Sequence, residues 1–282
     1  SGASDSTKTT VTYQNTLQTF DDQKNLLSNL AQSSSNATTG HFLYTSEEFS
    51  YEIDTLNLLT ASLDLNGAHF NSLGNSISQT FGGNGGLTQS YLQNNTSHTR
   101  WSGLDAGINY QLGFKSNKDR LLTMSYKYDK SPNSNDNLID VLNRYNYAVP
   151  SLHQTNATGT REQTFQVDYV HPLKKINIEG GLKAILRKNY SDFETADLDT
   201  VNHVYVNDPR SDNTYNYQQN VYSFYNNYQL NLKDWGFKAG LRIENTDVNA
   251  NFVTEGTPLA QNYTNVIPSV SIQRKFKGWS VN

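Results

Sequence analysis

The amino-acid sequence predicts an all-β protein, an antiparallel up-and-down meander of about ten long strands. Three observations support this fold class. Apolar and polar residues alternate over runs of about ten positions, which is the side-chain period of a strand. Tight turns join these runs in pairs. Long polar stretches separate each pair from the next, so the turns at the two ends of the strands differ in length.

The first 40 residues show the least regular pattern. Residues 20–32, "FDDQKNLLSNLAQ", place Leu26, Leu27 and Leu30 at helical spacing behind an acidic start, which predicts a short surface helix or an irregular loop. We therefore expect residues 1–40 to be loop or irregular, with the regular strands following them.

Five hairpins are predicted after this segment, each with apolar residues of one parity on both sides of a tight turn. In the stretch "WGFKAGLRIENTDVNANF", for example, Phe237, Leu241 and Ile243 share one parity and charged residues share the other. The apolar positions of the five hairpins are Phe49, Tyr51, Ile53, Leu59, Ala61, Leu63 and Leu65; Leu104, Ala106, Ile108, Tyr110, Leu112, Phe114, Leu122, Met124, Tyr126 and Tyr128; Phe165, Val167, Tyr169, Ile176, Ile178, Leu182, Ala184 and Leu186; Tyr222, Phe224, Tyr228, Leu230, Leu232, Trp235, Phe237, Ala239, Leu241 and Ile243; Val270, Ile272, Phe276, Trp279 and Val281.

The polar stretches between the hairpins are predicted to be long loops. They run to roughly 25–35 residues, well beyond the usual hairpin loop of 2–5. Short turns at one end of the strands and long loops at the other are typical of a transmembrane β-barrel.

The alternation alone leaves two orientations open. In a membrane barrel the apolar rows face lipid, whereas in a soluble barrel or sandwich they face a shared core. Three features favour the membrane: small residues on the apolar rows, such as Ala106, Ala184 and Ala239; aromatic residues next to the tight turns; and the asymmetry of the loops. A hydrophobic content of only 35% beside 12% aromatic residues also fits a thin apolar surface better than a dense core.

Composition and motifs exclude several classes. A net charge of −4 gives no electrostatic footprint for nucleic acid. The chain has no cysteine, and its six histidines lie at no metal-binding spacing, so we predict no metal site and no cofactor. No catalytic motif is present either, and we predict that the protein is not an enzyme.

Several segments resemble a known family. "YQQNVYSFYNNYQLNLKDWGFKAGLRIENTDVNANF" and "GTPLAQNYTNVIPSVSIQRKF" are similar to the C-terminal barrel of the outer-membrane β-barrel family found in TonB-dependent receptors of Bacteroidota-type bacteria. "LDAGINYQLGFK" and "EQTFQVDYVHPLKKINIEGGLKAILRKNYS" match the preceding hairpins. The resemblance covers most of the chain after about Leu104 and, more loosely, the part before it.

The resemblance implies a barrel of about 22 strands with an N-terminal plug. It also implies location in the cell outer membrane, contact with outer-membrane lipid, and energised import of a scarce, unknown small nutrient through a TonB-type complex that contacts the plug. On this basis residues 1–282 are expected to form a single partial barrel without the plug domain, joined at its sheet edges to missing strands, to another copy, or closed in a different way.

Two sets of candidate site residues follow. Aromatic residues in the expected loops are either a stacking platform for a ligand or anchors at the headgroup level: Tyr145, Tyr147, Tyr205, Tyr215 and Tyr217. Charged residues on the polar rows are expected to face the lumen, where they pair across the sheet, touch a plug, or contact substrate: Lys183, Arg187, Lys238, Arg242 and Glu244.

The sequence therefore predicts part of the barrel of a TonB-dependent outer-membrane receptor. The alternative is a soluble secreted or surface β-protein that binds glycans or a protein partner through long loops. An outer-membrane enzyme of the small-barrel type ranks third.

Overall fold

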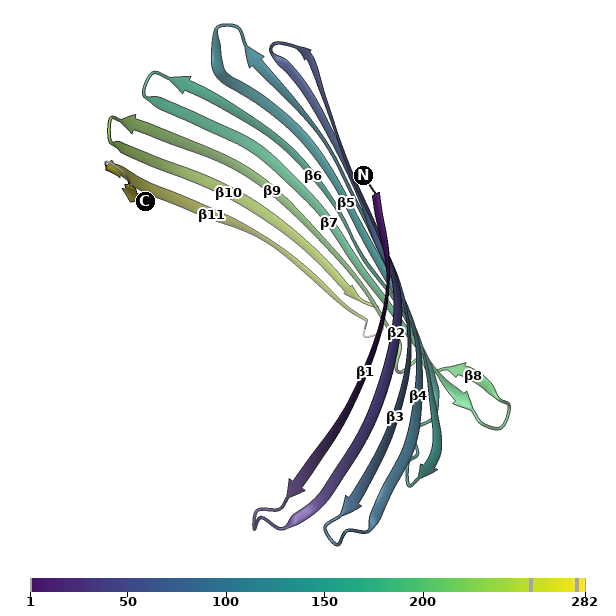
Figure 1. Cartoon of the computed structure of the whole chain (residues 1–282). Coiled ribbons are helices and arrows are strands. Elements are labelled where there is room, and N and C mark those ends of the chain that lie inside the picture. Colours follow the sequence, from purple (N-terminus) through teal and green to yellow (C-terminus); the bar gives the residue numbers. More distant parts are fainter. Residues whose placement is uncertain (1, 254–255, 277–278, 282) are drawn as a thin grey trace.

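Strands follow one another across a twelve-stranded antiparallel sheet in chain order, except that the short strand β8 pairs with β7 beside the main path (Figure 1). This computed structural model describes residues 2–253, 256–276 and 279–281. The strands are β1 (Gly2–Phe20), β2 (Leu26–Asp54), β3 (Asn57–Gly82), β4 (Leu87–Phe114), β5 (Asn117–Tyr145), β6 (Leu152–Leu173), β7 (Ile176–Asp199), β8 (Val204–Asn207), β9 (Asn213–Leu232), β10 (Trp235–Phe252), β11 (Thr257–Phe276) and β12 (Trp279–Val281).

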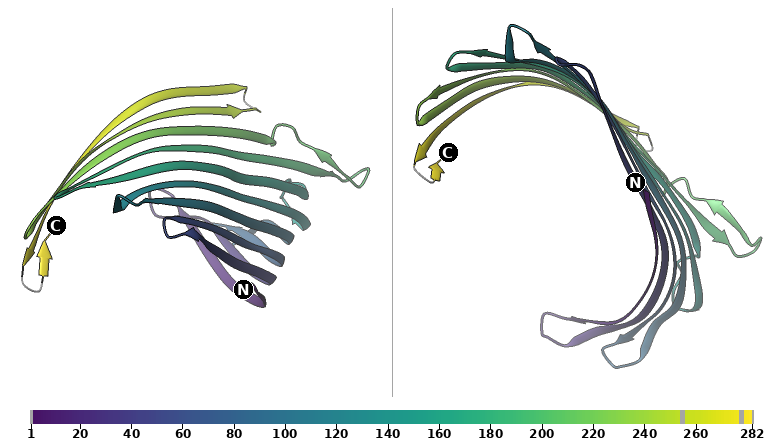
Figure 2. Two further views of the ribbon diagram at one scale, coloured as in Figure 1. Left: turned by 90° about the horizontal axis from the view of Figure 1, so that it is seen from above. Right: turned by 45° about the horizontal axis from the view of Figure 1, so that its top comes forward.

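The sheet bends into a curved wall with β1 at one edge and β11 and β12 at the other (Figure 2). Within the described residues these edges do not pair with each other, so the sheet is open, as expected for part of a barrel. The predicted all-β antiparallel meander is confirmed.

Pairing from β5 to β11 runs without a register shift along the main path. Residues that pair directly therefore share a face, and each face can be followed from strand to strand. Irregularities in β1 to β5 lie near strand ends, for example between Gly113 and Phe114.

The long polar stretches are not loops, and that expectation is wrong. Residues 66–99 continue β3 and β4 as a paired ladder up to a short turn between Gly82 and Leu87, where Gly85 takes a φ of 79°. A left-handed φ of this kind suits glycine. Strands on both sides pair with these Ser- and Asn-rich segments and satisfy their backbone N–H and C=O groups, so this pairing overrides a weak strand propensity.

The expected helix or loop in residues 1–40 is also wrong. Residues 20–32 form the end of β1, a turn, and the start of β2, with Leu30 paired to Leu17. The Asp21 carboxylate closes the turn because its Oδ1 accepts the N–H groups of Gln23 at 2.9 Å and Asn25 at 2.7 Å.

The sheet lacks a packed core in its described part, where the buried apolar residues are only Ala68, Val141, Val248 and Ala250. The apolar rows predicted from sequence are open instead: Ile108 is 47% exposed and Leu182 is 60% exposed. Across the described ranges the structure contains no helical segment with the length and hydrophobicity that spanning a bilayer requires.

Aromatic residues gather at the tight-turn end of the sheet. Trp235 stacks near Phe237 with ring centroids 6.0 Å apart, and the Arg274 guanidinium lies 4.9 Å from the Trp235 ring. Phe114 meets Tyr169 edge-on at 6.1 Å. This arrangement suits a headgroup-level girdle. Trp279, another aromatic residue next to a tight turn, begins β12, and the structure does not describe its side chain.

Candidate functional site

The two faces of the sheet differ in chemistry, and the register defines them. We call the face that carries Ile108, Leu182 and Leu241 the apolar face, and the face that carries Glu162 and Lys183 the polar face. On the polar face one row runs from Gln166 through Lys183, Ser223 and Glu244. The five charged residues predicted to share a face do so, because Arg187, Lys238 and Arg242 follow the same parity along β7 and β10.

The apolar face has the height of a membrane band. On β7 it runs from Ile176 to Leu186. These residues cover about 34 Å along the strand at 3.4 Å per residue, or roughly 24 Å perpendicular to the bilayer at a tilt of about 45°. This matches the apolar band of about 25 Å that outer-membrane barrels present to lipid.

Arg187 is held by one acid and one amide on the polar face. Its Nη2 lies 2.6 Å from Oε2 of Glu162, its Nε donates to the same oxygen at 2.7 Å, and its Nη1 donates to Gln219 at 3.0 Å. Glu162 pairs directly with Arg187 across β6 and β7, so the sheet register brings the charges together. The expected cross-sheet ion pair is present here.

A second polar cluster lies on β9 and β10. The Nε of Arg242 donates to Glu244 on its own strand, and Nη2 donates to the Ser223 hydroxyl at 3.1 Å. Farther toward the tight turns, Nζ of Lys238 lies 3.6 Å from Oε2 of Glu179. The charged side chains of these clusters are partly exposed, which suits a wet surface better than a protein core, whereas Ser223 is buried beneath Arg242.

Lys183 differs from these four residues because no acid in the described part of the chain forms an ion pair with it. It lies between two hollows of the polar face, of about 730 and 430 Å³, and both include Lys183 and Gln166 in their lining. The larger hollow also contains Asp105, whose Oδ2 lies 2.5 Å from Nζ of Lys127. Among the predicted cations, Lys183 is thus the one that forms no ion pair within the described residues, and its ammonium group can donate to another molecule or segment.

A close approach of two side chains over Gly181 was not predicted from sequence. The Tyr225 ring crosses Gly181, and its hydroxyl donates to the Asp168 carboxylate. A Cβ at position 181 would lie 2.6 Å from the Tyr225 ring, so glycine is required for this crossing. Adjacent glycines inside a strand, as at residues 180–181, are a signal of such a close approach, but they do not identify the partner strand.

The predicted aromatic residues all lie at the end of the sheet away from the tight turns, but they form separate groups. Tyr147 stacks on Tyr91 with centroids 3.9 Å apart, Tyr205 lies 6.0 Å from the His153 ring, and Tyr215 lies 6.2 Å from Tyr217. Tyr145 is 50% exposed at the end of β5. In the described ranges no ring contact joins these groups into one platform.

Burial and a nearby carboxylate shift the pKa of one of these tyrosines, Tyr205. Burial raises the pKa of the Tyr205 hydroxyl, and the Asp140 carboxylate, which accepts its hydrogen bond at 3.5 Å, raises it further. Tyr205 therefore stays a neutral donor. Within the described ranges no three His, Asp or Glu side chains converge as metal ligands would.

Comparison with known proteins gives one family and a general likeness of fold. The family described as "Outer membrane protein beta-barrel family" matches residues 112–282. No curated protein matches the chain.

Among solved structures, the chain is similar to the ferric citrate transporter FecA in its unliganded form, with 10% identity, a TM-score of 0.46, and coverage of 95% of this chain and 42% of FecA. It is similar to the siderophore receptor PiuA from Acinetobacter baumannii, with 11% identity, a TM-score of 0.37, and coverage of 94% and 46%. For the outer membrane protease OmpT from Escherichia coli the identity is 12%, the TM-score 0.27, and the coverage 98% and 96%. The chain spans less than half the length of FecA and PiuA.

Proposed function

The chain belongs to the outer membrane protein beta-barrel family and lies in the cell outer membrane, and on this premise we propose that it forms part of the barrel wall of a TonB-dependent receptor that imports a scarce nutrient. A soluble secreted protein, the alternative from sequence, does not fit membership of this family. The open apolar face of membrane height agrees with the location.

One observation carries the proposal: eleven strands pair in sequence along the main path, and the sheet still does not close within its described part. An edge strand facing hydrocarbon leaves backbone N–H and C=O groups without partners, so a membrane barrel must continue past both edges. Such a barrel is wide. Barrels of 16–18 strands already hold an aqueous channel, and 22-stranded transporters hold a plugged lumen.

The side chains of the polar face favour a lumen that holds a plug or a ligand over an open channel. Its acids and bases are paired across strands, as Glu162 and Arg187 are, while Lys183 keeps a donor beside the two hollows. We propose that residues 1–282 form one part of the wall and that Lys183 contacts either a plug supplied by another part of the receptor or the nutrient. The TonB-type complex would act through that plug.

The test is uptake by cells. A strain lacking the gene is compared with its parent for uptake of radiolabelled iron chelates, a corrin vitamin and oligosaccharides at nanomolar supply, with and without a protonophore. We expect the deletion to abolish uptake of one class, and the protonophore to abolish it in the parent. Uptake that continues at the parental rate after the proton gradient collapses would indicate a passive pore. Unchanged uptake of all classes in the deletion strain would also overturn the proposal.

A further inference from the structure

The apolar face carries a row of three cations at the end of its membrane band. Lys130 on β5 pairs with Arg161 on β6, and Arg161 pairs with Lys188 on β7. Direct pairing places them on one face of adjacent strands, with their Cα atoms spread over about 10 Å. All three side chains are exposed, and no acid in the described part of the chain pairs with any of them. We call these three residues the basic row.

The basic row is unfavourable for the isolated sheet. Like charges directly opposite each other on neighbouring strands are destabilising. The counter-charges of the sheet lie elsewhere: Glu162 and Asp129, although next in sequence to the basic row, point to the polar face. On the apolar face the first acid toward the band is Asp247, two strands from Lys188, where it accepts a hydrogen bond from Asn249 at 3.4 Å. An anion bound from outside would relieve the repulsion.

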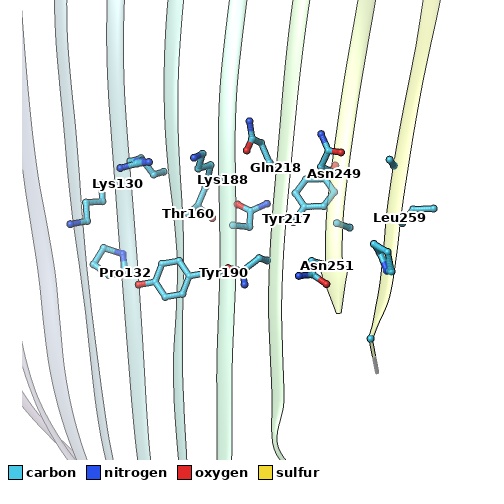
Figure 3. A pocket seen from close by; sticks show the side chains of 17 residues that line it. Lys130, Pro132, Thr160, Lys188, Tyr190, Tyr217, Gln218, Asn249, Asn251 and Leu259 are labelled. Carbon is cyan, nitrogen blue, oxygen red and sulfur yellow. The ribbon is translucent and has the colours of Figure 1, made fainter. Parts of the chain in front are cut away.

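A hollow of about 950 Å³ adjoins the basic row on the same face (Figure 3). Beyond the three cations its lining includes the hydroxyl and amide groups of Tyr190, Gln218 and Asn249, together with apolar residues such as Pro132 and Leu259. Figure 3 shows these side chains spread across neighbouring strands rather than enclosed between them. Cations beside several neutral hydrogen-bonding groups suit a phosphorylated sugar, because the cations meet phosphate and the amides meet hydroxyls.

A second hollow of about 410 Å³ lies within the apolar band of the same face. Its lining includes Phe165, Leu182 and Phe224, with the small side chain of Ala184 between them. Ala184 is four residues from Lys188 along β7, or about 14 Å. We call this second hollow the notch. Its apolar lining suits an acyl chain, and it lies on the membrane side of the basic row.

We propose that the basic row and the two hollows form a binding site for one lipid of the outer leaflet, whose headgroup is a phosphorylated sugar and whose acyl chain lies in the notch at Ala184. The tight turns lie at the other end of the strands, and in barrels of this kind tight turns face the periplasm. The basic row is therefore at the outer-leaflet edge of the band. The site depends on the membrane location alone and stands even if the transported nutrient is never found.

The experiment uses the intact receptor purified from outer membranes and measures lipid binding in nanodiscs by native mass spectrometry. The probe is lipid A, a bis-phosphorylated glucosamine disaccharide lipid, and the competitors are phosphatidylglycerol and inorganic phosphate. In the variant with Lys130, Arg161 and Lys188 each replaced by Gln, we expect binding to weaken by about fivefold per cation, on the order of 100-fold in all. If the triple variant bound lipid A with the affinity of the wild type, the proposal would be overturned.

The matched control replaces Lys115, Lys118 and Lys175 by Gln, which removes the same charge at the tight-turn end. It should bind lipid A as the wild type does, and equal weakening in both variants would mean that net charge alone attracts the lipid. Migration on gels without heating confirms that each variant is folded.

Two further arms identify the ligand as a lipid. Ala184→Phe fills the notch without altering charge, and we expect severalfold weaker binding of lipid A. Unchanged binding in this variant, or displacement of lipid A by millimolar inorganic phosphate, would show that the site takes free phosphate groups and not a lipid. Phosphatidylglycerol should compete poorly with lipid A for the site. If it competes as well as unlabelled lipid A does, the site does not recognise a sugar headgroup.

Discussion

The assignment of the two faces can be tested by exchanging a cation and an apolar residue at adjacent positions of β10. Leu241 lies on the apolar face and is 42% exposed, whereas Arg242 lies on the polar face. Leu241 is six residues from Trp235 in the aromatic girdle, which is about 20 Å along the strand and about 14 Å perpendicular to the membrane at a tilt of 45°. It therefore lies near the middle of the apolar band.

At that depth an arginine facing lipid costs about 2–4 kcal/mol. We expect Leu241→Arg to lower the free energy of unfolding by this amount. Arg242→Leu removes the hydrogen bond to the buried Ser223 hydroxyl and the ion pair with the partly exposed Glu244, so the expected loss is about 1–2 kcal/mol.

The measurement is urea-induced unfolding of the intact receptor in lipid vesicles, followed by gel mobility without heating. Leu182→Arg serves as a second lipid-face variant on β7 and should behave as Leu241→Arg does. Equal losses for the two β10 variants, or a larger loss for Arg242→Leu, would refute the assignment of the apolar face to lipid.

Three other changes have defined outcomes. Hydrogen bonds from the Leu56 N–H first, and then from Asn57, hold the pKa of the Asp54 carboxyl below its usual range. This carboxylate therefore stabilises the tight turn above the unfolded pKa of about 3.9, and the stabilisation is lost as the pH falls through the lowered folded pKa. A carboxyl-carbon NMR titration of Asp54 that gives an unshifted pKa would contradict this. Gly181→Ala should displace the Tyr225 ring and cost about 1–3 kcal/mol, whereas Gly180→Ala next to it should cost less, as vesicle unfolding measures; a greater loss at Gly180 would contradict the crossing at Gly181. Lys183→Gln should leave the unfolding midpoint unchanged and reduce nutrient uptake severalfold, whereas Lys183→Arg should retain most of it; full uptake in the glutamine variant would exclude this ammonium group from a contact with ligand or plug.

The hairpins were predictable because lipid imposes a strict pattern. Residues such as Ile108 and Leu182 must alternate with polar neighbours when one face meets hydrocarbon and the other meets water. Five tight turns could therefore be placed from the sequence, and the parity of each strand gave the shared face of Lys183, Arg242 and Glu244.

The outer halves of the strands were not predictable in the same way. Beyond the band both faces meet water, so the alternation that marks a strand disappears. Residues 66–99 then resemble a loop in composition, with many Asn, Ser and Gly residues. Their strand structure comes from pairing with neighbouring strands, and the local strand propensity of these residues does not predict that pairing.

The ion-pair partners within the candidate site could not be predicted from the sequence either. Lys238 and Glu179 are far apart in the chain, and they meet only because β7, β9 and β10 pair in a particular register. The basic row has the same origin. A sequence shows three isolated cations at positions 130, 161 and 188, and only the register places them side by side.

The outward continuation of the paired strands has a consequence for the mouth of the barrel. On β7 the residues past Leu186 extend to Asp199, which adds about 30 Å of height at a tilt of 45°. Beyond the apolar band the wall therefore continues outward as paired strands, which ladders of backbone hydrogen bonds hold together. Such ladders do not fold across an opening as free loops do, so the paired parts of these strands form a fixed rim and not a gate.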